Sequence, residues 1–237
     1  MKPPVDTHFD CNTIESMSNS LLGKAKREHL DVFNAHKVCN VYKRGQVVFH
    51  EGSHPFGVYC ISSGKVKLSH LGDDGKDQII RLLKEGDITG YRALLSGDRY
   101  GASAIVLEDS HVCFIPKEIF IDILKNDAGL AFEMMKLLAN ELHRAELQLT
   151  HLAQKPVRER LAETLLFIKD TYGFEQDGIT LNVRFSREEI ANLVGTATES
   201  TIRLLSEFKK DGMVELDGKK IKILQQKELE RTANLQD

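Results

Sequence analysis

The sequence contains no tryptophan and only five prolines and four cysteines in 237 residues. It also has no apolar run close to the roughly eighteen residues that a membrane-spanning helix requires, so no such helix is expected. The N-terminal stretch MKPPVDTHFDCN lacks the apolar core of a signal peptide. Because the cysteines at positions 11, 39, 60 and 113 are widely scattered, we expect reduced thiols in a cytoplasmic protein.

The sequence also lacks an excess of basic over acidic residues. The formal net charge is −3 at pH 7, and cationic and acidic side chains nearly balance from Gln154 onward. A nucleic-acid surface would therefore be local, and its candidate cations are Arg187, Arg203, Lys209, Lys210, Lys219 and Lys220. Such a small footprint predicts low affinity for random DNA, because phosphate contacts supply most of that affinity.

Residues 186–212 form the most informative segment, with the pattern of two helices around a tight turn. Ser186 can cap the first helix, and Glu189 three residues later completes a capping box. Gly195 supplies the left-handed residue that ends this helix. In a helix-turn-helix, the N-terminal end of the second helix contacts base edges in the DNA major groove.

The second helix is expected to open with a capping box of Thr196 and Glu199 and to run to about Lys210. Its inward side should hold the apolar residues Ile202, Leu204, Leu205 and Phe208. The residues left outside, near the end that reads bases, are Thr198, Glu199, Ser200 and Arg203.

The chemistry of these outer residues suits base reading. Arg203 can donate two hydrogen bonds to guanine O6 and N7, and Glu199 can accept one from cytosine N4. The two residues are four apart and so share one helix face. The alternative is an ordinary ion pair between them on a solvated helix, worth only roughly 0.2–0.5 kcal/mol.

Two short alternating segments, residues 213–216 and 220–224, follow this helix. Asp217–Gly218 between them is a strong signal for a hairpin turn. A helix-turn-helix followed by a two-stranded hairpin is a winged helix. Lys219 and Lys220 would lie at the tip of the wing, where a phosphate backbone would pass.

Residues from about 38 to 116 combine many glycines with short apolar alternations. Short strands with a turn about every eight to twelve residues are typical of a β-sandwich or barrel. From Pro116 the apolar period becomes helical and stays so past Tyr172.

Within the helical part, apolar residues recur at alternating spacings of four and three, which is a heptad pattern. This seam comprises Ala131, Met135, Leu138, Leu142, Ala145, Leu149 and Leu152. Its narrowness favours a coiled coil between identical chains over a helix packed on its own domain, which usually shows a broader stripe. Gln154–Lys155–Pro156 then predicts a hinge, since the residue before proline is disfavoured in a helix.

The order of glycine-rich roll, long helix and winged helix resembles the cyclic-AMP receptor protein / fumarate–nitrate reductase regulator (Crp/Fnr) family over nearly the whole chain. The stretches that carry the resemblance are YKRGQVVFHEG, VYCISSGKVKLS, KEGDITGYRALLSGDRYGASA, ERLAETLL and FSREEIANLVGTATESTIRLLSEFKKDGMVELDGKKIKI. The resemblance implies an α+β fold with an N-terminal arm (1–30), a cyclic-nucleotide-binding-like β-roll or jelly roll (31–128), a dimerisation helix (129–154) and a C-terminal winged helix-turn-helix (155–237).

The resemblance also implies a cytoplasmic, homodimeric transcription regulator, not an enzyme, that binds palindromic double-stranded DNA and RNA polymerase. The family's base-reading positions match Glu199 and Arg203, with Thr198 at the variable position before them. Its phosphate-contacting positions match Ser186 and Arg187. Half-sites resembling TGTGA or TTGAT are expected, with the outer base left open.

The effector site of the cyclic-AMP branch does not carry over. Gly90 is followed by Tyr91 where that branch has a ribose-binding Glu. Tyr100–Gly101 stands at its phosphate-binding Arg–Ser pair, and Ala145–Glu146 at its base-contacting Thr–Ser pair. Losing the arginine removes the strongest charge-assisted bond to a phosphate, so cyclic AMP is not expected as the effector.

Other effectors remain open: a small molecule other than cyclic AMP, a redox group or haem. Arg92 and Arg99 can build a different anion site, although the simpler interpretation makes both of them solvated loop residues. For haem, no spacing singles out one ligand among His8, His36, His50, His54 and His111.

The iron–sulfur branch of the family uses three cysteines in the arm and one on the roll. Cys11 and Cys113 match two of these positions, whereas Ile14 and Ser20 stand at the other two. Because a cubane cluster normally needs four thiolates, no cluster or other cofactor is expected.

The sequence argues against two other functional classes. A cupin-type metalloenzyme needs a His-x-His followed by a Glu on a strand, which His50–Glu51 and His54 do not provide. A ligand-binding module without DNA activity has no need of a winged helix. The sequence therefore predicts no catalytic residue and no metal site.

Overall fold

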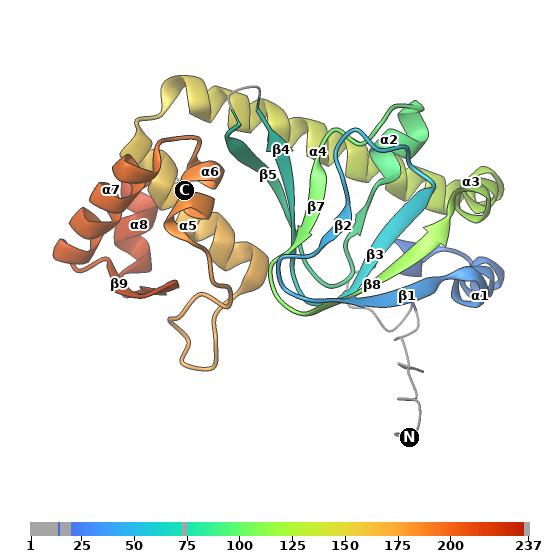
Figure 1. Cartoon of the computed structure of the whole chain (residues 1–237), viewed down its shortest axis with the longest axis horizontal. Helices are drawn as coiled ribbons and strands as arrows, with labels where there is room; N and C mark the ends of the chain where they lie inside the picture. Colours follow the sequence, from blue (N-terminus) through green and yellow to red (C-terminus); the bar gives the residue numbers. More distant parts are fainter. Residues whose placement is uncertain (1–13, 15–19, 73–74, 235–237) are drawn as a thin grey trace.

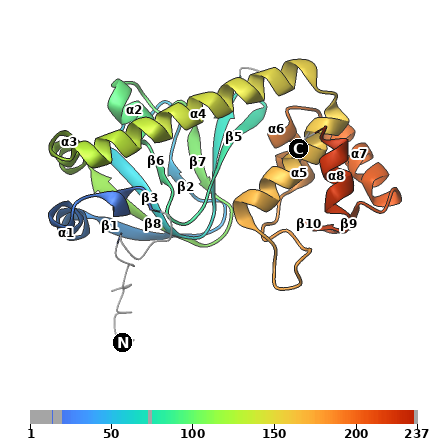
Figure 2. The ribbon, with the colours of Figure 1, turned by 180° about the vertical axis from the view of Figure 1, so that it is seen from behind.

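One long helix, α4 (Ala128–Gln154), runs along one side of the molecule and joins two domains (Figure 1). The computed structural model describes residues 14, 20–72 and 75–234. Asp127 caps the start of α4, and Lys155 and Pro156 leave the helical conformation after its end. Seen from behind, the N-terminal domain lies under one half of α4 and the C-terminal domain under the other end (Figure 2).

The N-terminal domain is a roll of two four-stranded antiparallel sheets, with strand orders β1–β8–β3–β6 and β2–β7–β4–β5. The strands are β1 (Val38–Tyr42), β2 (Val47–Phe49), β3 (Gly57–Ser63), β4 (Val66–Leu71), β5 (Asp77–Leu83), β6 (Ile88–Thr89), β7 (Ser103–Val106) and β8 (Ser110–Pro116). Side chains on a strand alternate between the two faces, so each sheet turns one face toward the interior of the roll.

Aromatic rings fill much of that interior. The rings of Phe49 and Tyr100 are stacked with centroids 4.0 Å apart, and Tyr59 lies 5.3 Å from Phe49. Val66, Leu83 and other aliphatic side chains complete this core.

Helices cover the outer face of the first sheet. They are η2 (Leu22–Lys24), α1 (Arg27–His36), α3 (Lys117–Asn126) and the first turns of α4, while the short α2 (Tyr91–Ser96) follows β6. Phe33, Phe120 and Leu130 are fully buried between these helices and the sheet. This packing fixes the direction in which α4 leaves the roll.

The C-terminal domain is a winged helix-turn-helix. Its elements are α5 (Val157–Tyr172), α6 (Arg187–Val194), α7 (Thr198–Lys210), β9 (Val214–Asp217), β10 (Lys220–Ile223) and α8 (Gln226–Thr232). The fold class predicted from the sequence, an α+β chain with roll, long helix and winged helix, is confirmed.

The core of the winged domain continues into the roll. Ile79 and Leu82 of β5 belong to the same buried cluster as Leu165 and Phe208. The buried Tyr172 hydroxyl donates to the carbonyl oxygen of Leu83 at 3.3 Å. The two domains therefore share apolar contacts as well as the covalent link through α4.

The expectation of four reduced thiols is wrong for two of them, because a disulfide joins Cys39 to Cys113. These residues are 74 positions apart, but the roll pairs β1 with β8 and sets them directly opposite each other. Cys60 occupies the facing position on the other side of Cys113, on β3. Scattered spacing says nothing about strand pairing, and Cys11 lies outside the described residues.

Part of α4 is left uncovered by the portion of the chain that the structure describes. Leu138 packs partly against the roll, whereas every residue from Leu142 to Thr150 is exposed. No helix among the described residues is long and apolar enough to cross a bilayer.

Asp127 ties the start of α4 to the N-terminal segment. Its carboxylate accepts hydrogen bonds from the backbone N–H groups of Leu130 at 3.0 Å and Lys26 at 2.9 Å, and His29 Nδ1 lies 2.9 Å from Oδ2. Burial alone would raise the pKa of this carboxyl. The bonds from Lys26, His29 and Leu130 outweigh that effect and hold the pKa well below its usual range.

We expect Asp127→Ala to lower the free energy of unfolding by about 2 kcal/mol at pH 7, because α4 loses its cap and two N–H groups lose an acceptor. Urea unfolding measures this. Since the folded-state pKa is depressed, the charge contributes fully above a pH of about 4 and is lost as the pH falls further. Asp127→Asn keeps a capping oxygen and should lose less, with a weaker acid dependence. An Asp127→Ala chain as stable as the wild type would refute the role.

Candidate nucleic-acid interface

The first helix of the motif, α6, begins and ends as the sequence predicts. The Ser186 hydroxyl accepts from Glu189 N at 3.0 Å, and the Glu189 carboxylate accepts from Ser186 N at 2.8 Å. Gly195 ends the helix with a φ of 71°. The predicted capping box and left-handed terminus are confirmed.

The second helix, α7, begins at Thr198, and the predicted capping box of Thr196 with Glu199 is wrong. Ala197 occupies the cap position and makes no side-chain cap bond. The backbone N–H of Thr196 donates to the carbonyl of Ala191 at 3.1 Å, so Thr196 still closes the end of α6.

The inward side of α7 also differs from the prediction. Thr201, Leu204, Leu205 and Phe208 are buried, whereas Ile202 is 47% exposed. The sequence showed Ile202, Leu205 and Phe208 three residues apart, but a helix turns every 3.6 residues, so such a row drifts around the axis. The buried stripe follows spacings of three, one and three, and Thr201 completes it despite its hydroxyl.

Two of the four predicted base-reading residues, Glu199 and Arg203, are exposed, and Thr198 and Ser200 are partly exposed. Arg203 Nη1 binds Glu207 Oε1 at 2.8 Å instead of pairing with Glu199. Glu207 in turn accepts from Arg158 at 3.0 Å. Among the described residues, Glu199 has no ion-pair partner, so the alternative of a Glu199–Arg203 ion pair is not what the structure contains.

The predicted hairpin is present, with Asp217 paired to Lys220 and Gly218–Lys219 in the turn. Lys219 is exposed, and within the described residues its ammonium group has no partner. Lys220 binds Glu175 at 2.9 Å, so it lies in the strand below the tip.

Arg187 connects the start of α6 to the wing. Its Nη2 donates to the carbonyl of Gly218 at 3.1 Å. The residue is half-buried, and that burial lowers the pKa of its guanidinium. Ser186 uses its hydroxyl in the capping box. The four predicted phosphate contacts therefore surround one edge of the motif, three of them engaged within the chain.

Sequence reasoning missed Arg160, whose guanidinium donates to the ends of two helices. It binds the carbonyls of Leu152 at 3.3 Å and Lys155 at 2.9 Å at the C-terminal end of α4, and those of Val194 and Gly195 at 3.2 Å each at the C-terminal end of α6. Helix C-termini leave carbonyls without partners and carry partial negative charge, so one cation serves both. The junction predicted as a hinge is thus bridged.

A second contact unforeseen from the sequence joins α6 to the roll. Lys67 of β4 is buried, and its Nζ lies 2.8 Å from Oε1 of the half-buried Glu189. Burial would raise the pKa of Glu189, but Lys67 and Ser186 outweigh it and lower the pKa below its usual range. The helix cap and the interdomain ion pair therefore use the same carboxylate.

The predicted effector residues are divided between buried and exposed positions. Tyr91 and Tyr100 are buried, and Gly90 opens α2 with a φ of 85°. Arg99 Nη1 donates to the Gly52 carbonyl at 2.9 Å, which supports its interpretation as a loop residue. The remaining predicted residues are all exposed: Arg92, Gly101, Ala145 and Glu146.

Instead, an internal network links the roll to α4. Arg81 Nη1 donates to the Tyr91 hydroxyl at 2.9 Å and also pairs with Glu141 of α4. Both charged side chains are largely buried. Glu141 was missed, although it lies one helical turn before the predicted Ala145 and so on the same side of the helix.

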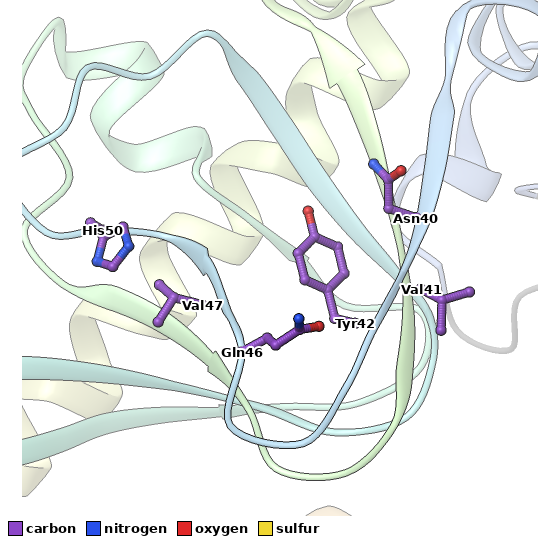
Figure 3. Close-up of a pocket in the computed structure, with 6 residues that line it drawn as sticks. All are labelled: Asn40, Val41, Tyr42, Gln46, Val47 and His50. Atoms are coloured by element: carbon purple, nitrogen blue, oxygen red, sulfur yellow. The ribbon is translucent and has the colours of Figure 1, made fainter.

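A shallow pocket of about 470 Å³ lies elsewhere on the roll, between β1 and β2 (Figure 3). Its lining residues are Asn40, Val41, Tyr42, Gln46, Val47 and His50. In Figure 3, Val41 and Tyr42 lie on opposite sides of β1. None of the predicted effector residues lines this pocket.

The sulfur donors do not fit a four-thiolate cluster. Cys113 is bonded to Cys39, and burial raises the pKa of the Cys60 thiol to about 12. Ile14 and Ser20 are both buried at the other two predicted positions. Across the described ranges, no three His, Cys, Asp or Glu side chains are grouped to hold a metal ion.

The histidines named as haem candidates are scattered. His36 Nδ1 lies 2.9 Å from the carbonyl oxygen of Val32, His50 lines the pocket of Figure 3, and His54 is exposed. His111 lies on β8, and His8 is outside the described residues.

Comparisons with known proteins agree with this architecture. Residues 39–127 match the cyclic nucleotide-binding domain, and residues 159–232 match the Crp-like helix-turn-helix domain. The fumarate and nitrate reduction regulatory protein of Vibrio cholerae is 30% identical over 229 residues, covering 95% of this chain and 90% of that protein. The anaerobic regulatory protein of Bacillus subtilis is 32% identical over 172 residues, 72% of each chain.

A crystal structure of a putative transcriptional regulator of the Crp/Fnr family from Eubacterium rectale has the same fold. Its TM-score is 0.73, with 22% identity over 90% of this chain and 97% of that one.

The Lys67–Glu189 pair predicts a pH-dependent variant. Lys67→Met should lower the free energy of unfolding by about 2–3 kcal/mol at pH 7, because it leaves a half-buried carboxylate without its cation. Burial then raises the pKa of Glu189, so the deficit relative to the wild type should shrink as the pH falls through that raised value. Chemical unfolding from pH 7 to pH 4 measures both effects.

The matched control is Lys67→Met combined with Glu189→Gln, which removes both charges and keeps a capping oxygen. It should recover most of the lost stability. A double variant no more stable than Lys67→Met alone would show that the ion pair is not the cause.

Proposed function

Because the chain belongs to the Crp/Fnr family of transcription regulators, with a helix-turn-helix DNA-binding domain, we propose that it binds a palindromic operator as a homodimer and reads bases through α7. The observation that carries the proposal is the exposed face at the start of α7, where Glu199 and Arg203 stand one turn apart.

Base reading requires Arg203 to leave Glu207. The pair is exposed on both sides, and such pairs contribute little, with a median of about 0–1 kcal/mol. Guanine O6 and N7 offer the same guanidinium two acceptors. Glu199 has no ion-pair partner in residues 20–72 and 75–234, so it can accept from cytosine, with Thr198 and Ser200 beside it. Replacing the ion pair with Glu207 by two hydrogen bonds to guanine therefore favours DNA binding.

Phosphate contacts would come from the edge formed by α6 and the wing. Lys219 is positioned for this without any rearrangement. Arg187 and Lys220 would first release Gly218 and Glu175, while Ser186 offers its backbone and hydroxyl at the helix N-terminus. Because only Lys219 of these four contacts could act without rearrangement, affinity for random DNA would stay low.

The apolar stripe of α4 supports the homodimer. Leu142 is 62% exposed and Leu149 is 68% exposed, and Met135, Ala145 and Leu152 extend the same side of the helix. A second copy of α4 would cover these side chains by coiled-coil packing. The two recognition helices would then be related by a two-fold axis, as half-sites of a palindrome require.

The sensor domain would act without cyclic AMP or a cofactor. The stacked rings of Phe49 and Tyr100 occupy the interior of the roll, and the Arg81–Glu141 pair already holds α4 to it. No arginine stands at the phosphate position of the cyclic-AMP branch. Any effector would shift the population of dimers toward or away from the arrangement that fits DNA.

One observation favours a redox signal as the alternative effector. The disulfide links β1 to β8, the strand that contacts α1 and α3, and its reduction would remove this covalent link and leave only the strand pairing. Operator affinity measured with and without dithiothreitol tests this redox signal. Equal affinity under the two conditions would exclude regulation through the disulfide.

The setting we propose is the cytoplasm, with RNA polymerase as a second partner. The experiment that tests the function is a binding selection on the purified chain, with a random duplex library at near-physiological salt. The expected product is a palindrome with TGA-like half-sites. Absence of enrichment, also with cyclic nucleotides added, would refute sequence-specific binding and favour a binding module without DNA activity.

Arg203→Ala should weaken the selected operator by about 1–3 kcal/mol and relax specificity at one base pair. Lys219→Ala should weaken all sequences alike, because a phosphate carries no base identity. Titrations on the operator and on scrambled DNA separate the two variants. Equal loss on both DNAs for Arg203→Ala would rule out base reading by this residue.

Leu142→Asp should convert the dimer to a monomer and abolish operator binding, since it places a charge in the middle of the seam. Leu147→Asp is the matched control, because Leu147 is exposed on the opposite side of the same helix. Sedimentation equilibrium reads the oligomeric state. A dimeric Leu142→Asp chain, or a monomeric Leu147→Asp chain, would contradict the seam.

A further inference from the structure

The face of α7 that points outward contains one apolar side chain. Glu199, Ile202, Arg203 and Ser206 follow spacings of three, one and three, which places them on one side of the helix. Ile202 is the apolar member and is 47% exposed. A single exposed apolar residue is common on protein surfaces. What distinguishes this one is its place between two residues that suit base reading.

The surface that Ile202 presents is also rigid. Isoleucine is branched at Cβ, and in a helix it adopts one χ1 rotamer in most cases. The backbone around it is held as well, because the Ser206 hydroxyl donates to the Ile202 carbonyl at 2.9 Å. Little conformational entropy remains to be lost when another surface covers this side chain.

The chemistry of the DNA major groove narrows what that surface can be. Base edges there present donors, acceptors and one kind of apolar group, the C5-methyl of thymine. Resting on the proposed function, we propose that Ile202 contacts the C5-methyl group of an operator thymine and is a specificity-determining residue of this chain.

The position of the thymine follows from the helix geometry. Ile202 and Arg203 are consecutive, so they are separated by only about 1.5 Å along the helix axis, less than one base-pair step. The thymine therefore lies in the base pair next to the guanine that Arg203 reads. Together with Glu199, one helical turn before Arg203, Ile202 and Arg203 would read a short contiguous block of the half-site.

The test replaces each thymine of the selected operator with deoxyuridine, one symmetric pair at a time. This exchange removes the methyl group and leaves every hydrogen-bonding group unchanged. Affinities are measured by fluorescence anisotropy for the wild-type chain, for Ile202→Ala and for Ile202→Val. Leu95→Ala is the matched control, since Leu95 is similarly exposed but lies on α2 of the roll.

We expect one thymine in each half-site at which the exchange weakens the wild-type chain about fourfold per half-site, or roughly 15-fold for the palindrome. Ile202→Ala should be insensitive to the same exchange, while Ile202→Val and Leu95→Ala should respond as the wild type does. Because Ile202 is exposed, the thermal unfolding of the Ile202→Ala chain should match that of the wild type. That match would exclude a folding defect as the cause of the lost sensitivity.

An operator on which no thymine is sensitive, or sensitivity that persists in Ile202→Ala, overturns this inference alone. A chain that selects no operator overturns the proposed function, and the inference with it. The two failures are distinguished by the selection that precedes the exchange.

Discussion

The position of the DNA-facing helices depends on one guanidinium. Arg160 binds carbonyls at the ends of both α4 and α6, and few residue types have enough donors in a planar arrangement to do so. Gly195 belongs to the same junction, because a Cβ on it would come within 2.8 Å of Leu152. The end of the long helix and the turn of the helix-turn-helix are thus in direct contact. A rotation of the end of α4 would therefore have to break these bonds or carry α6 with it.

The roll is connected to this junction along two routes. Lys67 binds the carboxylate that caps α6, and Arg81 binds Glu141 in the middle of α4. In both cases a buried or largely buried cation from the second sheet meets a carboxylate of another element. Such pairs are costly to break on one side only. The sheet that contains β4 and β5 is therefore the part of the roll that these ion pairs connect to α4 and α6.

How much the sequence predicts depends on whether the determinant is local. The cap at Ser186, the terminus at Gly195 and the turn at Gly218 each need only a few neighbouring residues, and all three are present in the structure. The apolar period of α4 is likewise local. Ile202 was misplaced because a spacing of three approximates the helical repeat over one turn and fails over two.

What the sequence did not reveal are contacts between distant elements. The bond between Cys39 and Cys113 depends on the pairing of the first and last strands of the roll. Arg160, Lys67 and Glu141 acquire partners only when three elements meet, and nothing in their immediate surroundings sets them apart from surface charges. The burial of Tyr91 and Tyr100 was likewise beyond the family pattern, which transfers positions along the chain but not the packing of the side chains that occupy them.

The exposed half of α4 has a consequence for the amount of protein in the cell. With a second copy covering this stripe, as proposed above, association would follow mass action, so the paired fraction would rise with the concentration of chains. At low abundance, single chains would present leucines to water and to proteases. The number of paired chains would then rise more steeply than in proportion to the rate of synthesis, without any ligand being sensed.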